Sequence, residues 1–302
     1  DGDIDLIMNE HKGPDLETQL WINDGKGVFS MVTVDMGKES HLGTQFADLD
    51  RDGDLDIVSA GWDEYAFVHV WRNEAIPTDR VKWTHYSTEK GDIPAPNSGD
   101  QQTASLIVDI DKDGIQDFVI TERTAAPSVV WYKFDNYTWK RFVVEDEALR
   151  IEAGSTHHDI DGDGDQDIVF GGESQSNEVW WWENPYPDFD QPWTRRTIKS
   201  SGGTKHHDQL FGDFDGDGRE ELVFWNQGDH RLYLAEIPED PRNAGLWGLK
   251  VVYQYFTDSQ MKQLGQELYP GWKGNHEHEG LAKADIDGDG LPDIIGGGRW
   301  FK

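Results

Sequence analysis

Cysteine is absent from this chain of 302 residues, and basic side chains and long apolar runs are scarce. Without cysteine the chain can form no disulfide and has no thiolate chemistry. No apolar run approaches the roughly 18 residues of a membrane span, and no heptad pattern indicates a coiled coil. The 27 Lys and Arg against 59 Asp and Glu give a net charge of −32, which opposes binding to nucleic-acid phosphates.

The acidic residues are concentrated in a repeated motif, D-x-D-x-D-G-x-x-[DE], followed each time by a short apolar run. Five complete copies start 61, 50, 54 and 72 residues apart. Their acidic residues are Asp48, Asp50, Asp52 and Asp56; Asp109, Asp111, Asp113 and Asp117; Asp159, Asp161, Asp163 and Asp167; Asp213, Asp215, Asp217 and Glu221; and Asp285, Asp287, Asp289 and Asp293. Asp1, Asp3 and Asp5 fit the tail of an earlier copy.

Alternating carboxylates on a tight, glycine-containing loop converge on one hard cation, so the motif predicts several structural calcium ions. We expect the backbone carbonyl of the seventh loop residue to complete each site, at Asp54, Ile115, Asp165, Arg219 and Leu291. An EF-hand is excluded because it needs flanking helices and an acidic twelfth loop residue, where the first copy has Ser59. Calcium loops of ordinary affinity fill best outside the cell, which favours a secreted, periplasmic or cell-surface protein.

Each repeat also predicts four β-strands. In the first complete copy these are 41–47 before the acidic loop, 57–60 after it, an aromatic strand at 68–71, and a closing strand at 83–86. Four strands in roughly 50 residues are typical of a propeller blade. The sequence therefore predicts an all-β protein, a single β-propeller domain over 1–302. Because the chain opens inside a motif, we expect it to be truncated at one or both ends: four full blades, a first blade without its inner strand, and a last one ending at Lys302. We expect the tryptophans of the third strands to pack between blades.

The repeats resemble those of the FG-GAP/VCBS family. This resemblance implies a calcium-binding propeller, commonly with seven blades. Two stretches resemble more particularly the propellers of aldos-2-ulose dehydratase and of rhamnose–glucuronate polysaccharide lyases. They are the His206–Asp208 run before Asp213, and residues 278–282 before Asp285. This narrower resemblance implies elimination on a uronate- or ulose-type sugar.

Two aligned positions carry polar side chains where strand cores are normally aliphatic. Seven residues before the first loop aspartate stand His41, Gln102, Glu152, His206 and His278. Six residues after the last loop acid stand His11, Trp62, Arg123, Glu173, Gln227 and Arg299. Five residues before the first aspartate, four of the five side chains are Gly or Ala, as a crowded axis requires. We expect both polar sets to face the channel opening opposite the calcium loops, where propellers usually bind ligands.

The first functional hypothesis is a carbon–oxygen lyase, a polysaccharide lyase or sugar dehydratase acting by β-elimination. A neutral histidine suits proton abstraction, so His206, His41, His278 and His207 are the candidate bases or acids. Arg123 and Arg299 would neutralise the substrate carboxylate, and Trp62 would stack on the sugar. The histidines are alternatively ligands for one further divalent metal. His206 and Asp208 are expected on one strand face, with the carboxylate orienting the imidazole.

The second hypothesis is a non-catalytic, adhesion-type module whose polar face binds a glycan or a protein. A third is a hydrolase in which Glu152 and Glu173 form a carboxylate pair. The histidines discriminate between the first two, because a binder needs no titratable bases at the channel mouth. The partner expected in either case is a carbohydrate substrate or ligand, with no nucleic acid and no membrane span.

Overall fold

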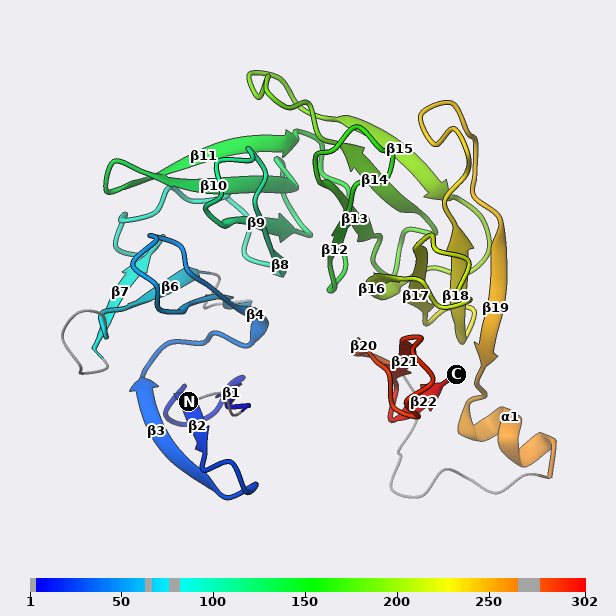
Figure 1. Ribbon diagram of the computed structural model, residues 1–302, viewed down its shortest axis with the longest axis horizontal. Coiled ribbons are helices and arrows are strands. Elements are labelled where there is room, and N and C mark those ends of the chain that lie inside the picture. Colours follow the sequence, from blue (N-terminus) through cyan, green and yellow to red (C-terminus); the bar gives the residue numbers. More distant parts are fainter. Residues whose placement is uncertain (1–3, 63–66, 76–81, 266–277) are drawn as a thin grey trace. The chain divides into compact units, whose positions relative to one another are not determined.

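The computed structural model describes residues 4–62, 67–75, 82–265 and 278–302. Within these ranges the strands form six antiparallel sheets, and the one helix is short (Figure 1). This helix, α1 (Asp258–Gln263), begins at a capping box formed by Thr257 and Gln260. No helix of the described ranges has the length and apolar character that crossing a membrane demands.

The sheets fall into two compact units of three sheets each. Unit 1 comprises residues 1–149 with 186–192, and unit 2 comprises residues 150–185 with 193–302. In unit 1 the first sheet contains β1 (Leu6–Asn9), β2 (Thr18–Asn23) and β3 (Phe29–Asp35). The second contains β4 (Leu42–Ala47), β5 (Asp56–Ala60), β6 (Val68–Asn73) and β7 (Trp83–Ser87). The third contains β8 (Gln102–Val108), β9 (Asp117–Glu122), β10 (Val129–Asp135) and β11 (Thr138–Glu145).

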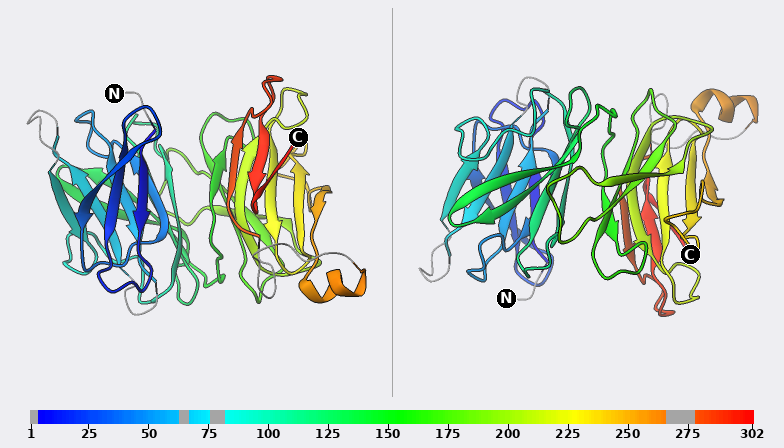
Figure 2. Two further views of the ribbon diagram at one scale, coloured as in Figure 1. Left: turned by 90° about the horizontal axis from the view of Figure 1, so that it is seen from below. Right: turned by 90° about the horizontal axis from the view of Figure 1, so that it is seen from above.

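Unit 2 also contains three sheets, with the three-stranded sheet last. Its first sheet contains β12 (Thr156–His158), β13 (Asp167–Gly171), β14 (Val179–Glu183) and β15 (Thr194–Lys199). The second contains β16 (His206–Gly212), β17 (Glu221–Asn226), β18 (Arg231–Glu236) and β19 (Leu249–Gln254). The third contains β20 (Leu281–Ala284), β21 (Asp293–Gly296) and β22 (Arg299–Phe301). Strand β16 contacts β12, β13 and β20, so the three sheets of the unit lie side by side (Figure 2).

Each sheet is a meander in which sequential strands pair, which is the architecture of a propeller blade. The predicted all-β propeller class is therefore confirmed, as is the order of four full blades between two incomplete ones. The first sheet begins with the strand that follows an acidic loop and has no inner strand among the described residues. The described residues hold six blades, and the prediction of one continuous propeller domain stays a prediction.

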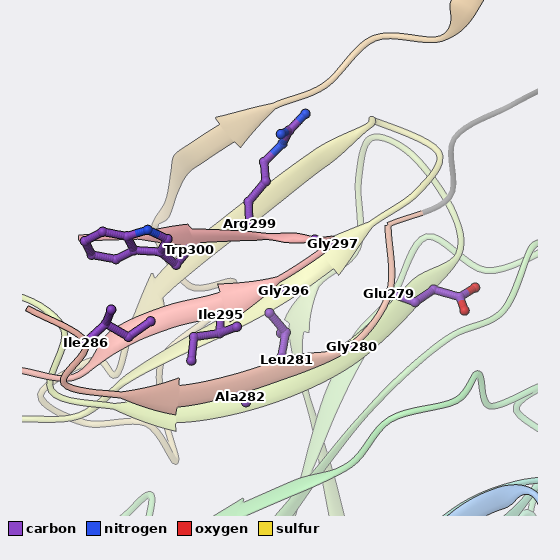
Figure 3. A pocket seen from close by; sticks show the side chains of 11 residues that line it. Glu279, Gly280, Leu281, Ala282, Ile286, Ile295, Gly296, Gly297, Arg299 and Trp300 are labelled. Carbon is purple, nitrogen blue, oxygen red and sulfur yellow. The ribbon is translucent and has the colours of Figure 1, made fainter. Parts of the chain in front are cut away.

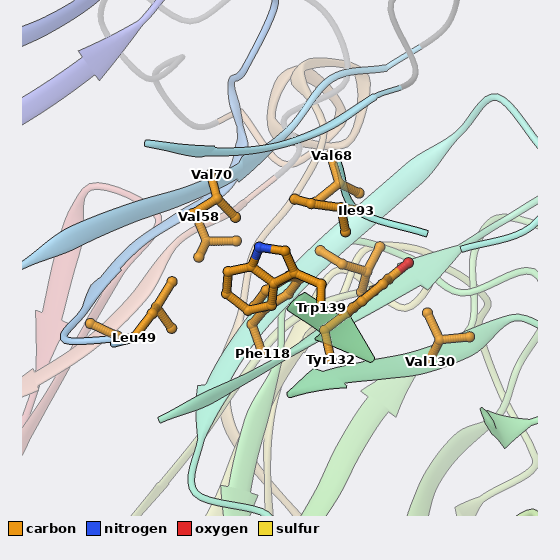
Figure 4. Close-up of a cluster of buried hydrophobic side chains, with 11 residues drawn as sticks. Leu49, Val58, Val68, Val70, Ile93, Phe118, Val130, Tyr132 and Trp139 are labelled. Atoms are coloured by element: carbon orange, nitrogen blue, oxygen red, sulfur yellow. The ribbon is translucent and has the colours of Figure 1, made fainter. Parts of the chain in front are cut away.

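The core of unit 1 explains why the strand pattern is so regular. Figure 4 shows Trp139 of β11 surrounded by Val58 and Val70 of the second sheet and Phe118 and Tyr132 of the third. The cluster therefore joins two blades rather than filling one, because each blade has apolar side chains on a face that only its neighbour can cover.

The tryptophans of the third strands are buried, as the sequence predicts. Trp71, Trp131, Trp181 and Trp182 are at most 1% exposed. Trp181 packs in one cluster with Phe211 of the next blade. Trp181 therefore packs between blades, and none of the four indoles is accessible to a ligand.

Candidate metal loops and polar blade edges

The five acidic loops have the same internal hydrogen bonds. In each, the first aspartate accepts a bond from the glycine amide, as Asp109 does from Gly114 at 2.9 Å. The third aspartate accepts one from the residue after that glycine, as Asp113 does from Ile115 at 2.8 Å. The glycines have positive φ, between 80° and 96°, which the turn requires and other residues rarely adopt.

The last acid of each loop begins the following strand and is buried. It accepts a hydrogen bond from the residue after the first loop aspartate, at 2.9 to 3.0 Å in all five copies. Asp117 and Ile110 are one such pair, and Asp167 and Ile160 another. The acid thus closes the loop onto its own blade.

The donor set fits a calcium ion. The carboxylate oxygens of Asp213, Asp215, Asp217 and Glu221 lie within 4.8 Å of one another, and three carboxylates converge in the same way in the loops that begin at Asp48, Asp109 and Asp159. Buried oxygens of Asp48, Asp50, Asp111 and Asp159 have no hydrogen-bond partner among the described residues. Hard oxygen donors at this density are typical of calcium sites, and a dication would satisfy them.

The charge in these loops is costly without a cation. Burial raises the pKa of Asp56 to about 7 and the pKa of Asp117 and Asp167 to about 8. Basic side chains offset part of this charge: Lys133 pairs with Asp111 and Asp113, and Arg242 pairs with Asp161 and Asp163. The loops therefore concentrate negative charge that a bound cation would neutralise.

The stump of a sixth loop is visible at Asp5. Its carboxylate accepts a hydrogen bond from Asn23 at 2.8 Å, as Asp56 does from Asn73 and Asp167 does from Asn184. Asp5 thus occupies the place of the last loop acid, as the sequence predicts. Asp1 and Asp3 lie outside the described residues.

The two polar positions lie at the opposite end of each blade from its acidic loop. In the second sheet Leu42 pairs with Ala60 while Ala47 pairs with Asp56, so the strand start and the loop are at different ends. The same pairing orders β8 against β9 and β16 against β17. Within each unit, the position after the second strand of one blade lies against the inner-strand start of the next.

Two of the small residues near the start of the inner strands, Gly43 and Gly154, are required by close approach between blades. A Cβ atom on Gly43 would lie 2.4 Å from the backbone nitrogen of Ser105, and one on Gly154 would lie 2.3 Å from the Cα atom of Asp208. Both glycines have positive φ. The crowding inferred from the alignment is thus present between neighbouring blades in both units.

In unit 1 the structure brings together His11, His41 and Trp62. The rings of His11 and His41 have centroids 4.0 Å apart, and Trp62 lies 6.1 Å from His11. Lys12 stands over the indole of Trp62. Glu39 contacts both histidines, although the alignment did not single it out. The signal for Glu39 was its spacing of two residues from His41, which places both on one side of an extended chain.

Backbone contacts hold the other polar-edge residues of unit 1, either between two blades or within one. Trp62 forms an isolated bridge with Gln101. Arg123 donates its backbone N–H to the carbonyl of Gln101 at 3.0 Å, and Gln102 beside it is 1% exposed.

In unit 2, His206 is buried and its ring nitrogens are already bonded. Its Nε2 atom lies 2.9 Å from the Asn226 side-chain nitrogen and 3.0 Å from Lys199 Nζ, both of which donate. Its Nδ1 atom lies 3.1 Å from the carbonyl of Gly172, which fixes the neutral tautomer. Burial, aided by the charge of Lys199, lowers the pKa of His206 to about 3. The lone pair that a general base needs is thus occupied.

The expected pairing of His206 with Asp208 is wrong. The register of β16 shifts between His207 and Gln209, and Asp208 has a φ of 49°. This bulge breaks the alternation of side chains, so Asp208 lies with His207 instead, at 3.8 Å. Its carboxylate accepts a hydrogen bond from Gly280 at 2.8 Å, while its amide donates to Ala153 at 3.1 Å. Asp208 thus joins three successive blades.

His207 lies among carboxylates. Its Nε2 atom is 3.5 Å from Glu152 and 3.6 Å from Glu279, and its side chain is 11% exposed. Gln227 donates to Glu279 at 3.2 Å. An acidic sugar would meet negative charge at this position, which does not favour binding of a uronate.

The remaining predicted site residues of unit 2 make structural contacts. Glu173 is buried and paired with Arg150 at 2.6 Å. Burial alone would raise the pKa of Glu173, but the hydrogen bonds from Arg150 and Ser174 outweigh it and lower that pKa. His278 is 1% exposed and stacks on Tyr255 with centroids 3.9 Å apart, and Arg299 stands over Tyr253.

The last blade also has an open, mainly apolar pocket of about 550 Å³ (Figure 3). Leu281, Ile295 and Trp300 line it, and Glu279 and Arg299 lie at its rim. Its lining comes from the last blade and includes Arg299 of the second polar set but none of the histidines.

In five blades of this chain an acidic loop joins the first two strands. The family model of the FG-GAP-like repeat matches residues 1–59 and 159–224. Together with the six blades, this match supports a relationship between the chain and the FG-GAP propeller family. The more particular likeness to sugar dehydratases and lyases receives no such match.

Comparison with solved structures finds the crystal structure of the V. cholerae biofilm matrix protein Bap1. That chain is 14% identical over 80% of the present chain, with a TM-score of 0.44. The present chain spans 40% of its length. No curated protein matches the chain.

Proposed function

We propose that this chain is a calcium-stapled propeller module that binds a glycan or a protein without turning it over. The observation that carries the proposal is the state of the histidines in unit 2. His206 and His278 are at most 1% exposed and are held by Lys199, Asn226 and Tyr255. A base must reach the proton it abstracts, and these side chains are packing and hydrogen-bonding residues.

The calcium ions would have a structural role. Each loop would hold its ion through the four acidic side chains and the seventh-residue carbonyl, and the ion would fix the loop between the first two strands of a blade. Because such loops fill best at millimolar calcium, we propose a secreted, periplasmic or cell-surface location.

The ligand-binding surface that we propose is the polar edge of unit 1. Trp62 offers an aromatic face with a polar tip, and Lys12 and His11 beside it offer hydrogen-bond donors. An indole next to charged and polar groups is the usual combination for holding a sugar ring, which makes a glycan the first ligand to test.

The experiment compares binding with turnover. The protein is mixed with a panel of acidic and neutral polysaccharides, in calcium and in excess chelator. Binding is followed by calorimetry, and elimination by the ultraviolet absorbance of the conjugated double bond that it creates. We expect saturable, calcium-dependent binding to at least one polymer and no rise in absorbance.

Two variants sharpen this test. Trp62→Ala should weaken binding, whereas Trp300→Ala, an exposed indole on the last blade, should not. An absorbance rise that disappears in His207→Ala or His41→Ala would reject the binding-module proposal and restore the lyase hypothesis. If Trp62→Ala leaves binding unchanged, the ligand binds somewhere other than the polar edge of unit 1.

A further inference from the structure

Two imidazoles and one carboxylate converge at the edge between the first two blades of unit 1. His11 follows β1, while Glu39 and His41 lie in the segment that joins β3 to β4. The ligand-type atoms of the three side chains lie within 4.8 Å of one another. His11 Nδ1 contacts Glu39 Oε1, and His41 Nδ1 lies 3.3 Å from the same oxygen.

The carboxylate of Glu39 is the unusual member of this cluster. Glu39 is fully buried, and its second oxygen, Oε2, has no hydrogen-bond partner among the described residues. Taking a carboxylate out of water is costly unless it is paired with opposite charge or coordinates a metal. A dication between the three side chains would supply that opposite charge and a partner for the second oxygen.

The backbone that carries Glu39 and His41 is fixed before any ion binds. The carbonyl of Ser40, between them, accepts hydrogen bonds from Asn9, Thr44 and Ser59. The Ser40 hydroxyl lies 2.9 Å from that of Thr18. These contacts tie the segment to both blades, so the ligands are positioned by the fold rather than by the metal.

We propose that His11, Glu39 and His41 form a binding site for one divalent transition-metal ion of the zinc type. Two imidazoles with one carboxylate are a donor set of such ions, whereas calcium prefers the all-oxygen sets of the acidic loops. The chain would then carry two chemically distinct classes of metal site. The inference does not depend on what the blade edge binds.

The site would keep open coordination positions. Three protein ligands leave room for water or a ligand atom, and the exposed fractions of the His11 and His41 side chains, 38% and 21%, provide access. Trp62 lies 6.1 Å from the His11 ring, so a molecule that completed the coordination sphere would be within reach of the indole.

The test uses zinc(II) alone, with cobalt(II) as a spectroscopic probe. The whole chain is stripped with chelator, returned to millimolar calcium to fill the acidic loops, and titrated with each metal by calorimetry and absorbance. We expect one zinc per chain, not displaced by calcium, and cobalt bands typical of mixed imidazole and carboxylate ligation. His41→Ala and Glu39→Gln should each weaken zinc binding at least 100-fold, more than the roughly 10- to 100-fold cost of losing an outer partner of a metal ligand.

His157→Ala is the matched control, because it removes a histidine of unit 2 that lies beside Gln166, outside the cluster. Melting temperatures give a second readout: in chelator Glu39→Gln should be as stable as the parent or more so, while zinc should stabilise only the parent. Zinc binding that His11→Ala and His41→Ala leave unchanged would overturn the proposal. So would the absence of zinc binding, which would mean that His11 serves only as the counter-ion of Glu39.

Discussion

The acidic loops and the polar edges are at opposite ends of the same blades, and they differ in how strictly they repeat. Every complete loop has the same three hydrogen bonds. The glycine amide donates to the first aspartate, the next amide donates to the third aspartate, and the amide after the first aspartate donates to the buried last acid. The edges share a position but not a chemistry: His41 lies beside a carboxylate, whereas His206 is bonded to Lys199 and Asn226.

The strict repetition of the loops and the variation of the edges indicate different roles, one in stabilising every blade and the other in contacts of particular blades. A feature that every blade needs, such as closing the turn between its first two strands, is repeated with the same geometry. A feature that differs from one blade to the next contributes either to packing between particular neighbours or to recognition. The histidines fall into both groups, and only burial and hydrogen bonding distinguish them.

Calcium removal should have the largest effect, because it acts on all loops at once. An ion present at 100 times its Kd stabilises the fold by about 2.7 kcal/mol per site. We expect excess chelator to lower the melting temperature by more than about 10 °C, with recovery on adding calcium but not magnesium. A calorimetric melting curve that chelator leaves unchanged would contradict the assignment of the loops.

Loss of one loop should cost about the contribution of one ion. Asp117→Asn keeps an acceptor for Ile110 but removes the buried charge, so in calcium the free energy of unfolding should fall by about 2 to 3 kcal/mol. In chelator the variant should be as stable as the parent or more so, because the pKa of Asp117, raised to about 8, shows how costly its ionisation is. Urea unfolding measures both, with the exposed Asp146→Asn as control. Equal losses with and without calcium would mean that Asp117 serves packing alone.

A smaller effect should appear in the pH dependence of stability at the edges. The pKa of His206 is lowered to about 3 in the folded state, against about 6.5 in the unfolded chain. The unfolded chain therefore binds the extra proton as pH falls below about 6.5, and stability present above that pH is lost at up to about 1.4 kcal/mol per pH unit.

His206→Gln removes this titration, so its free energy of unfolding should vary less than the parent's between about pH 7 and about pH 5. Urea midpoints in saturating calcium measure the difference. Ligand binding at the edge of unit 1 should be unaffected. The same slope in variant and parent would indicate that His206 is accessible to protons in the folded state.

The smallest effect is expected at Asp208. Its positive φ and its bond to Gly280 suit asparagine equally well, so Asp208→Asn should change stability by less than about 0.5 kcal/mol. Asp208→Ala should cost about 1 kcal/mol, because it leaves the Gly280 amide without its partner. Chemical denaturation of the two variants checks this, and a large loss in the Asn variant would show that the charge next to His207 matters.

Much of the fold could be predicted because its signals are local. Alternating aspartates, a glycine and an apolar run within a dozen residues define a loop and the strand after it, as at Asp109 to Phe118. The aromatic third strands and the incomplete first and last blades follow from the same periodicity. The edges were harder because the expected side-chain directions assume regular strands, and register shifts near the starts of β4, β8 and β16 break the alternation of side chains.

The sequence by itself determined the class of the fold, the position of every acidic loop and the level at which polar side chains collect, because these depend on residues close in the chain. Only the tertiary structure decided which histidines are accessible and what surrounds them. His206 acquires Gly172 from the preceding blade, and His41 and Glu39 acquire His11 from the first blade. Such partners are supplied by blade-to-blade packing, which brings together residues distant in sequence and therefore leaves little local pattern to read.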